Sequence, residues 1–402
     1  MARAKFRIAT LFALAAPFCL PLIFIIRVIR PLITIHFIWL PSRLIGHAVL
    51  DPEMHLCRAA LNLTSKEDGR FLDLYYFEST QHSNGYWKKM VERHLPVHRF
   101  YYYLNRFNKI FPGWQPHSPA SYGELHSTAD PDNLLGRIGP QIRFNVEEEQ
   151  IGLEFLKKLG IPSSGKFVCV QIRDSAHDAK LNPVGLSPRY NEYRNSDVSH
   201  YTEAFEFLVQ RGYWVIRMGK LTAGALQINH PQIIDYSNSG DRTEFLDLWL
   251  CVNCTFMLST GSGIDALAAI GRKPIVCVDF LAYMDTTYFF RNSIIIFKHL
   301  YETKTGRKLP LKEIVERESE TYYKSSDFYW SRNIEWRENT AQEIREAVEE
   351  MHARIDGTWV ESPVDEELQR VAGSMIAGSA QYQSQYKNGF VHRLGAKFLR
   401  SL

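Results

Sequence analysis

The sequence predicts an α/β protein in which the strands of a parallel sheet alternate with helices. The short apolar run Phe256–Ser259 leads into Gly261–Gly263, and a small-residue segment (264–270) and a second apolar run (274–279) follow. This order is typical of a βαβ unit, whose strands are parallel. Buried-strand and amphipathic-helix patterns also alternate over most of the chain, as in doubly wound sheets. Its 402 residues, 45% apolar and 23% charged, are enough for two such domains.

The N-terminal region has an unusual composition. The first fifty residues contain no Asp or Glu, and Ile8–Ile26 is an uncharged stretch of 19 residues with Pro17 and Pro21 inside. This is at the short end for a bilayer-spanning helix, and basic residues on both sides leave its orientation open. We expect residues 1–30 to be a hydrophobic membrane-attachment segment that either spans the bilayer or lies in its interface. A signal peptide and a buried core helix are the alternatives.

A first Rossmann-like domain is expected over residues 31–114. Strand and helix patterns alternate there, as they do in a small α/β domain. The strands are expected at 32–40 and 71–77, and the helices at 48–61, 86–93 and 100–111.

Residues 115–145 are rich in Pro, Gly, Ser and His, so we expect an interdomain linker there. The linker contains Asp130-Pro131-Asp132, a spacing with which two carboxylates can hold Mn²⁺ or Mg²⁺. Because this motif lies in a polar loop and not at the end of an apolar strand, we interpret it as a turn and expect no metal site. Cys251 and Cys254 form a CxxC without a second ligand pair, and we expect them to face a core.

A second Rossmann-like domain is expected over residues 146–351, where strand and helix patterns alternate again. The strands are expected at 167–172, 213–218, 233–235, 256–259 and 274–279, and the helices at 147–159, 201–211, 243–251, 264–270 and 341–351. Asn339-Thr340 with Glu343 forms a capping box for the last helix. Residues 352–402 end in the basic amphipathic stretch Asn388–Leu402, and we expect this tail to pack on the N-terminal domain or on a membrane surface.

The glycine turn at Gly261–Gly263 is the first candidate binding site. Helix N-terminal amides attract anions, and glycine lets an anion approach the backbone closely. With a hydroxyl from Thr260 or Ser262 and guanidinium groups from arginines 173 and 217, such a turn suits a departing diphosphate. Gly219 follows the strand of Arg217 and lies at the same expected edge. The spacing is neither GxGxxG nor GxxxxGK[ST], which excludes dehydrogenase-type and P-loop sites, and a simple tight connection is the alternative.

His47 is the candidate general base. It follows the expected strand 32–40 in a glycine-containing turn, and imidazole titrates near neutral pH. Asp51 and Glu53 lie within the next two turns and are expected to act instead of the imidazole or to orient it. The alternatives are a helix-start histidine without chemistry and, for Arg173, a structural ion pair with Asp174 or Asp178.

Several segments resemble a bacterial family of GT-B-fold glycosyltransferases encoded with surface-polysaccharide genes. The resemblance spans roughly residues 32–351, and the latter half is more loosely similar to fucosyltransferase-like and heptosyltransferase-like GT-B domains. The matching segments are RLIGHAVLDPE (43–53), VQIRDSAHD (170–178), YRN (193–195), VIRMG (215–219), STGSGID (259–265) and NTAQEIREAVEEM (339–351). The resemblance implies two Rossmann-like domains that face each other across a cleft.

The resemblance also assigns site residues. It implies that Gly46 and His47 border the acceptor. It implies that a nucleotide-sugar donor is bordered by Arg173, Tyr193, Arg194, Asn195 and the loop Ser259–Asp265, which includes Thr260, Gly261, Ser262, Gly263 and Asp265.

These observations lead us to expect a metal-independent glycosyltransferase at the cytoplasmic face of the inner membrane, with no cofactor apart from its donor substrate. It would transfer a sugar from a nucleotide-diphosphate sugar to a lipid-linked or polysaccharide acceptor. The net charge of +3 is too small for a nucleic-acid footprint. The alternatives are a nucleotide-sugar 2-epimerase and a non-catalytic GT-B-like subunit that binds envelope-glycan assembly proteins.

Overall fold

The computed structural model describes residues 2–63, 70–126, 129–176, 189–220, 222–281, 283, 292–319, 325–378 and 392–402, with side chains from residue 15 onward. The chain forms two compact units. Unit 1 consists of residues 1–128 and 140–144, and unit 2 consists of residues 129–139 and 145–402. The segment that we expected to be a linker is therefore divided between the two units.

Unit 1 is built on two parallel strands, β1 (Thr34–Leu40) and β2 (Phe71–Phe77). Its helices are α1 (Ala2–Val28), α2 (Ile45–Ala60), α3 (Gly85–His94), α4 (Arg99–Asn108), η2 (Gln115–His117) and α5 (Tyr122–His126). The expected alternation of strands and helices is confirmed for the described residues, although the sheet is small.

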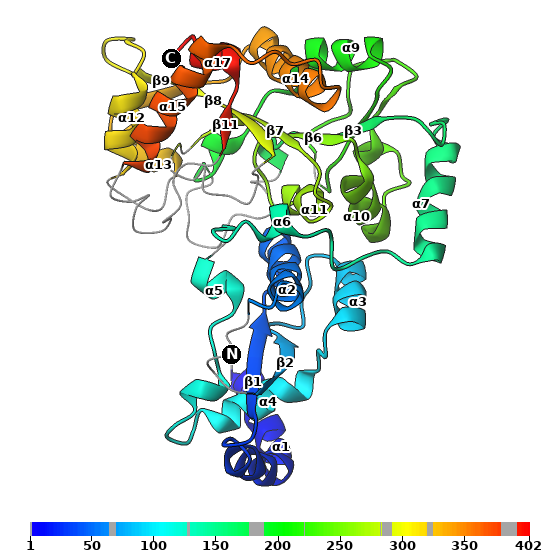
Figure 1. Ribbon diagram of the computed structural model, residues 1–402, viewed down its shortest axis with the longest axis vertical. Helices are drawn as coiled ribbons and strands as arrows, with labels where there is room; N and C mark the ends of the chain where they lie inside the picture. The colour runs from blue at the N-terminus through cyan, green and yellow to red at the C-terminus, as the bar shows by residue number, and fades with distance from the viewer. Residues whose placement is uncertain are drawn as a thin grey trace. The chain divides into compact units, whose positions relative to one another are not determined.

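The first helix is part of the core of unit 1. α1 and α4 lie side by side (Figure 1). Cys19 and Ile23 of α1 are buried in one cluster with Phe37 of β1 and Phe107 of α4. Among the described residues, no helix combines the length and the apolar character needed to cross a membrane.

Unit 2 contains a seven-stranded parallel sheet with the order β11-β8-β7-β6-β3-β4-β5. The strands are β3 (Phe167–Gln171), β4 (Trp214–Arg217), β5 (Ile233–Ile234), β6 (Phe256–Ser259), β7 (Ile275–Phe280), β8 (Ser293–Phe297) and β11 (Arg393–Leu394). β9 (His299–Glu302) and β10 (Ile334–Arg337) form a separate antiparallel pair. The predicted α/β class with a large parallel sheet is confirmed.

Helices cover both faces of this sheet. α9 (Thr202–Gln210) and α14 (Ala341–Ile355) contact each other on one face, and α10 (Glu244–Asn253) and α11 (Asp265–Ile270) contact each other on the other (Figure 1). The remaining helical segments are α6 (Leu134–Arg137), α7 (Val146–Lys158), η3 (Glu192–Arg194), η4 (Val198–Tyr201), η5 (Tyr236–Asn238), α12 (Leu311–Glu318), α13 (Ser326–Ser331), α15 (Pro363–Ala377) and α17 (Ala396–Leu399). Strands buried on both faces explain the continuous apolar runs in the sequence.

Local signals correctly placed several elements. Thr340 and Glu343 form the predicted capping box of α14. Asp130 accepts hydrogen bonds from the backbone N–H groups of Leu134 and Leu135, so the DxD segment is the turn that we expected. Cys251 and Cys254 are fully buried, as predicted.

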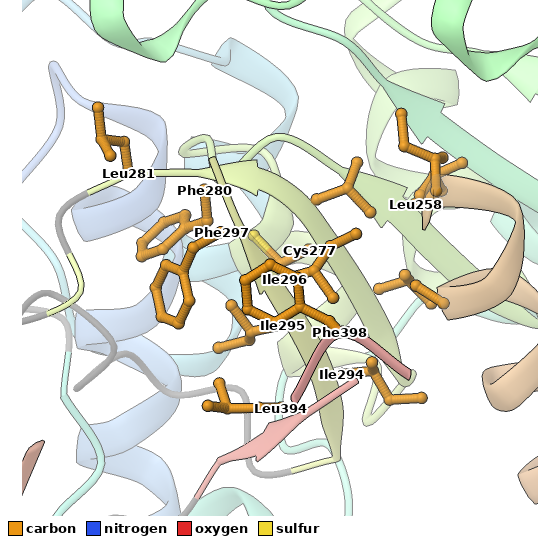
Figure 2. Close-up of a cluster of buried hydrophobic side chains, with 14 of the residues drawn as sticks. Leu258, Cys277, Phe280, Leu281, Ile294, Ile295, Ile296, Phe297, Leu394 and Phe398 are labelled. Carbon is orange, nitrogen blue, oxygen red and sulfur yellow. The ribbon is translucent and has the colours of Figure 1, made fainter. Parts of the chain in front are cut away.

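The C-terminal tail belongs to unit 2, so the expectation that it packs on the N-terminal domain is wrong. β11 pairs with β8, and Leu394 and Phe398 join the cluster formed by Ile294, Ile295 and Phe297 (Figure 2). The basic residues of the tail alternate with these apolar ones, which extend the sheet and its core. Residues 388–391 of the predicted amphipathic stretch lie outside the described residues.

Candidate functional site

The strand order of unit 2 reverses between β3 and β6. β4 and β5 extend the sheet beyond β3, whereas β7, β8 and β11 extend it beyond β6. In open α/β sheets, ligands bind beyond the carboxyl ends of the strands at such a switch point. Arg173 follows β3 and Thr260 follows β6, and the backbone N–H of Arg173 donates to Thr260 Oγ1 at 3.1 Å. The structure therefore brings these two predicted residues together at the switch point.

The turn after β6 requires glycine at its first position. Gly261 has φ +78°, and a Cβ atom there would lie 2.5 Å from the ring of Phe280. Its N–H donates to Ser259 Oγ at 3.2 Å. The backbone at Gly261 is therefore determined by both its conformation and its close contact with β7.

The amide of Ser262 does not have the role that the sequence predicted. It donates to Asp265 Oδ2 at 2.8 Å, and Ser259 Oγ donates to Asp265 Oδ1 at 2.6 Å. Asp265 is fully buried, and this burial raises its pKa to about 6 against the opposing hydrogen bonds from Ser259 and Ser262. The carboxylate of Asp265 thus takes the position that we expected for a phosphate at Ser262. α11 has only six residues, so it adds little dipole.

The loop that contains Tyr193, Arg194 and Asn195 lies against this turn. Arg194 Nη2 donates to the carbonyl oxygen of Gly261 at 2.8 Å. Arg194 and Ser262 are half-buried and Gly263 is exposed. The part of the switch point that a ligand can reach therefore combines a guanidinium group, a hydroxyl group and a glycine backbone.

A buried polar network that includes Lys298, which the sequence did not identify as a candidate, holds the same loop. Asp279, in β7, has φ +50° and accepts hydrogen bonds from Ser196 Oγ and from the backbone N–H of Asn339. Lys298 Nζ donates to the carbonyl oxygen of Asn195. Lys298 has no exposed surface, and burial lowers its pKa. A lysine directly after the apolar run 294–297 was the sequence signal for this network.

Two predicted donor contacts are structural in this fold. Arg217 is 2% exposed, its Nη1 donates to the carbonyl oxygen of Gly224 at 2.7 Å, and its guanidinium lies 3.7 Å from Asp174 and 3.6 Å from Asp235. Gly219 is buried with φ +143°. The expected contact of Arg217 with a diphosphate is therefore not supported, because its charge is already neutralised inside the fold.

Two other predicted donor residues are also largely enclosed. Arg173 is 5% exposed and Tyr193 is 8% exposed. The backbone N–H of Tyr193 donates to Ser326 Oγ at 3.1 Å. Asp178, one of the two partners that we considered for Arg173, lies outside the described residues.

In unit 1, His47 lies in the first turn of α2, shortly after β1. It is half-buried, and burial lowers its pKa while the nearby Glu78 opposes this shift. A lowered pKa keeps the imidazole neutral at pH 7, which is the form that a general base needs.

Asp51 and Glu53 hold neighbouring backbone. Asp51 is 2% exposed, and its Oδ1 accepts a hydrogen bond from the N–H of Gly123 at 2.5 Å. Glu53 is fully buried and accepts hydrogen bonds from the N–H groups of Gln141 and Ile142, each at 2.9 Å. The expectation that these two carboxylates act on an acceptor is therefore not supported, because both are enclosed and hydrogen-bonded to the chain.

No cluster of three or more His, Cys, Asp or Glu side chains in the described part of the chain is arranged to hold a metal ion. A surface hollow of 380 Å³ lies between α9, α14 and α17, away from the switch point. Two basic side chains that line it are paired within the protein, with Arg345 Nε 2.8 Å from Glu349 and Lys397 Nζ 3.2 Å from Glu346.

No protein-family model and no curated protein matches the sequence. Among solved structures, the chain is similar to a glycosyl transferase of family 9 from Veillonella parvula DSM 2008, with 12% identity, a TM-score of 0.43, and coverage of 79% of this chain and 97% of that chain. It is also similar to the ADP-heptose LPS heptosyltransferase II of E. coli, with 11% identity, a TM-score of 0.42, and coverage of 80% and 99%. The iron-containing heptosyltransferase TibC shows 11% identity, a TM-score of 0.36, and coverage of 80% and 76%.

Proposed function

We propose that this chain is a metal-independent glycosyltransferase of the GT-B type, in which unit 2 binds a nucleotide-diphosphate sugar and unit 1 binds the acceptor. The observation that supports this most is the position of Arg194 beside the Gly261–Gly263 turn, at the switch point of a doubly wound sheet. A guanidinium group there offsets the negative charge that develops on a departing diphosphate.

The role proposed for His47 is to take the proton of the acceptor hydroxyl. Its half-buried position and lowered pKa support this role, since the imidazole is deprotonated at neutral pH. In this proposal the buried Asp51 and Glu53 keep the start of α2 in place.

The proposed acceptor is a lipid-linked or polysaccharide intermediate of bacterial surface-glycan biosynthesis, and the proposed location is the cytoplasmic face of the inner membrane. The apolar, acid-free N-terminal region supports this location, because attachment to a membrane concentrates the enzyme beside an amphiphilic acceptor.

Nucleotide-sugar binding by the full chain tests the donor half of the proposal. Titration calorimetry with a panel of nucleotide sugars should identify a ligand, and Arg194→Ala should weaken its binding about tenfold or more, as expected for loss of a hydrogen bond to a charged group. Arg345→Ala, which removes a surface arginine of α14, is the matched control and should leave the dissociation constant unchanged. If the native chain binds no nucleotide sugar, the proposal is wrong.

Transfer assays with the identified donor test the catalytic half. His47→Gln should retain donor affinity and lower the transfer rate by about 10²–10⁴-fold, which is the usual contribution of a general base. The native rate should fall on the acid side as His47 becomes protonated, and the variant should lack this limb. An epimerised free nucleotide sugar formed without acceptor would instead identify the chain as an epimerase. Glycan output that survives both His47→Gln and Arg194→Ala in cells would indicate a non-catalytic subunit.

A further inference from the structure

We propose that the outer face of α1 binds the surface of a bilayer containing anionic phospholipids, with the helix lying in the plane of that surface. The outer face is defined by Phe18, Leu20, Leu22, Phe24, Ile25 and Val28. The proposal deepens the proposed function, on which its relevance to a lipid-linked acceptor rests.

One side of α1 is already occupied by protein. Cys19 and Ile23 are 0% and 1% exposed in the cluster shared with α4. At the end of the helix, Arg27 donates to the carbonyl oxygen of Pro112 at 2.7 Å and to Asn108 Oδ1 at 3.0 Å. Since α1 is bound to unit 1 along this side, only its outer face is available to a lipid.

The outer face is apolar and exposed. Phe18 is 67% exposed, Phe24 is 71% exposed and Val28 is 61% exposed. At 3.6 residues per turn these side chains fall on the opposite side of the helix from Cys19 and Ile23. A helix that presents one apolar side to its own protein and a second to solvent is unusual, and a continuous exposed apolar surface indicates a binding surface.

Exposed apolar side chains also lie in the segment that follows α4 and directly after α1. The guanidinium of Arg27 lies over the ring of Phe111, 5.5 Å from its centroid, so the two segments meet. Phe111 is 40% exposed and its neighbour Ile110 is 66% exposed, and Leu32, after the end of α1, is 76% exposed. Exposed apolar side chains of unit 1 are therefore also present near the end of α1.

The charge of the segments that contain α1 and α4 indicates an anionic partner. Residues 1–50 and 93–123, which include the contacting helices α1 and α4, contain ten Lys and Arg residues and no Asp or Glu. Since the whole chain has a net charge of +3, the rest of it carries −7. Arg30, Arg106 and Lys109 are exposed. Apolar side chains bordered by cations are the pattern of helices that bind anionic membranes in the plane of the interface.

The same charge disfavours a second copy of this chain as the occupant. Two copies that met through the outer faces of α1 would bring together two acid-free, basic surfaces, which repel each other. A lipid headgroup layer with negative charge complements this surface, whereas an identical surface does not.

Vesicle flotation with the full chain, in the absence of nucleotide sugar, tests the proposal. The native chain should bind vesicles of phosphatidylcholine mixed with phosphatidylglycerol, bind pure phosphatidylcholine less tightly, and lose affinity as salt increases. The double variant Phe18→Glu/Phe24→Glu should lower the partition coefficient at least about tenfold, because each buried Phe accounts for about a tenfold gain or more. Val360→Glu, at an apolar position of unit 2 that is 83% exposed, is the matched control and should bind as the native chain does.

A second variant tests the basic residues near the outer face. Arg30→Glu/Arg106→Glu should weaken binding to the anionic vesicles about tenfold or more and change binding to neutral vesicles little, because each basic residue contributes about a fivefold gain near an anionic surface. Thermal melting identifies the folded variants, and only variants that melt as the native chain does are compared.

Any of three results would overturn the proposal. The first is a native chain that fails to bind anionic vesicles, and the second is a Phe18→Glu/Phe24→Glu variant that floats as well as the native chain does. The third such result is self-association of the native chain, seen by light scattering, that the Phe18→Glu/Phe24→Glu variant lacks. Nucleotide-sugar affinity, measured without vesicles, separates this proposal from the proposed function. Variants of the outer face should retain that affinity, and a native chain that floats but binds no nucleotide sugar would refute only the proposed function.

Discussion

At the scale of single residues, burial determines which of the candidate groups can react with a ligand. The carboxylate of Asp265 accepts hydrogen bonds from the hydroxyl of Ser259 and the backbone N–H of Ser262. The carboxylate of Glu53 accepts hydrogen bonds from the backbone N–H groups of Gln141 and Ile142. Buried backbone N–H groups need partners, and nearby carboxylates are strong acceptors. Some of the candidate site residues therefore form hydrogen bonds that stabilise the fold, and their polar groups are not available to a ligand.

Asp51 should make the stability of the protein depend on pH. Burial raises its pKa from about 3.9 in an unfolded chain to about 7. Between these two values Asp51 holds a proton in the folded protein that it has lost in the unfolded chain, so the contribution of Asp51 to the free energy of unfolding falls as the pH rises from about 4 to about 7 and is constant above that. Asp51→Asn removes this dependence and keeps an oxygen for the N–H of Gly123.

The free energy of unfolding of Asp51→Asn should therefore rise relative to that of the native chain as the pH rises. Between pH 4 and pH 8 this difference should change by up to about 4 kcal/mol. Urea unfolding across this range measures the difference. Asp132→Asn, at an exposed position, is the control and should show a constant difference from the native chain. A constant difference for Asp51→Asn as well would mean that Asp51 titrates normally.

At the scale of elements, the connection from β6 to α11 depends on one glycine. The left-handed backbone at Gly261 and the contact with Phe280 of β7 both exclude a side chain. Loop 193–196 in turn rests on this connection through Arg194, and on β7 through Ser196. The candidate donor site is thus assembled from three segments that hold one another.

Gly261→Ala should destabilise unit 2 more than a substitution that adds only backbone strain. Gly306 has φ +67°, and no heavy atom lies within 4 Å of the position that a Cβ atom would take there, so Gly306→Ala should cost only the left-handed conformation, about 1–2 kcal/mol. Gly261→Ala should lose a further ~1–3 kcal/mol, because the new methyl group overlaps the ring of Phe280. Urea denaturation measures both losses, and equal losses would show that Phe280 moves aside freely.

At the scale of the whole molecule, each of the two units has a hydrophobic core among its described residues. Phe37 belongs to the cluster of α1, α4 and the two-stranded sheet in unit 1, whereas Phe256 belongs to the cluster around the seven-stranded sheet in unit 2. Chains with more than one domain commonly depart from two-state unfolding, because each core melts as its own cooperative unit.

Differential scanning calorimetry should therefore resolve two transitions. Phe37→Ala should lower the melting temperature of one and Phe256→Ala that of the other, because each change removes about 3–5 kcal/mol from its own core. Each variant is the control for the other. A single transition that both substitutions shift equally would contradict this expectation and show that the two units unfold together.

The sequence by itself determined the class of the fold and the local geometry of several turns. Buried strands such as Phe256–Ser259, the capping box at Thr340 and the turn at Asp130 depend on residue patterns within a few positions, and such patterns are visible in a linear chain.

Only the tertiary structure decided which of these features meet and which groups stay available. The strand order that creates the switch point, the partners of Arg217 and the addition of β11 to the sheet each join residues that are distant in sequence. The sequence also did not distinguish the two sides of α1. Both sides are apolar, and only the packing of α4 against one of them makes that side buried and leaves the other exposed. Long-range packing selects these contacts, and no local pattern encodes it.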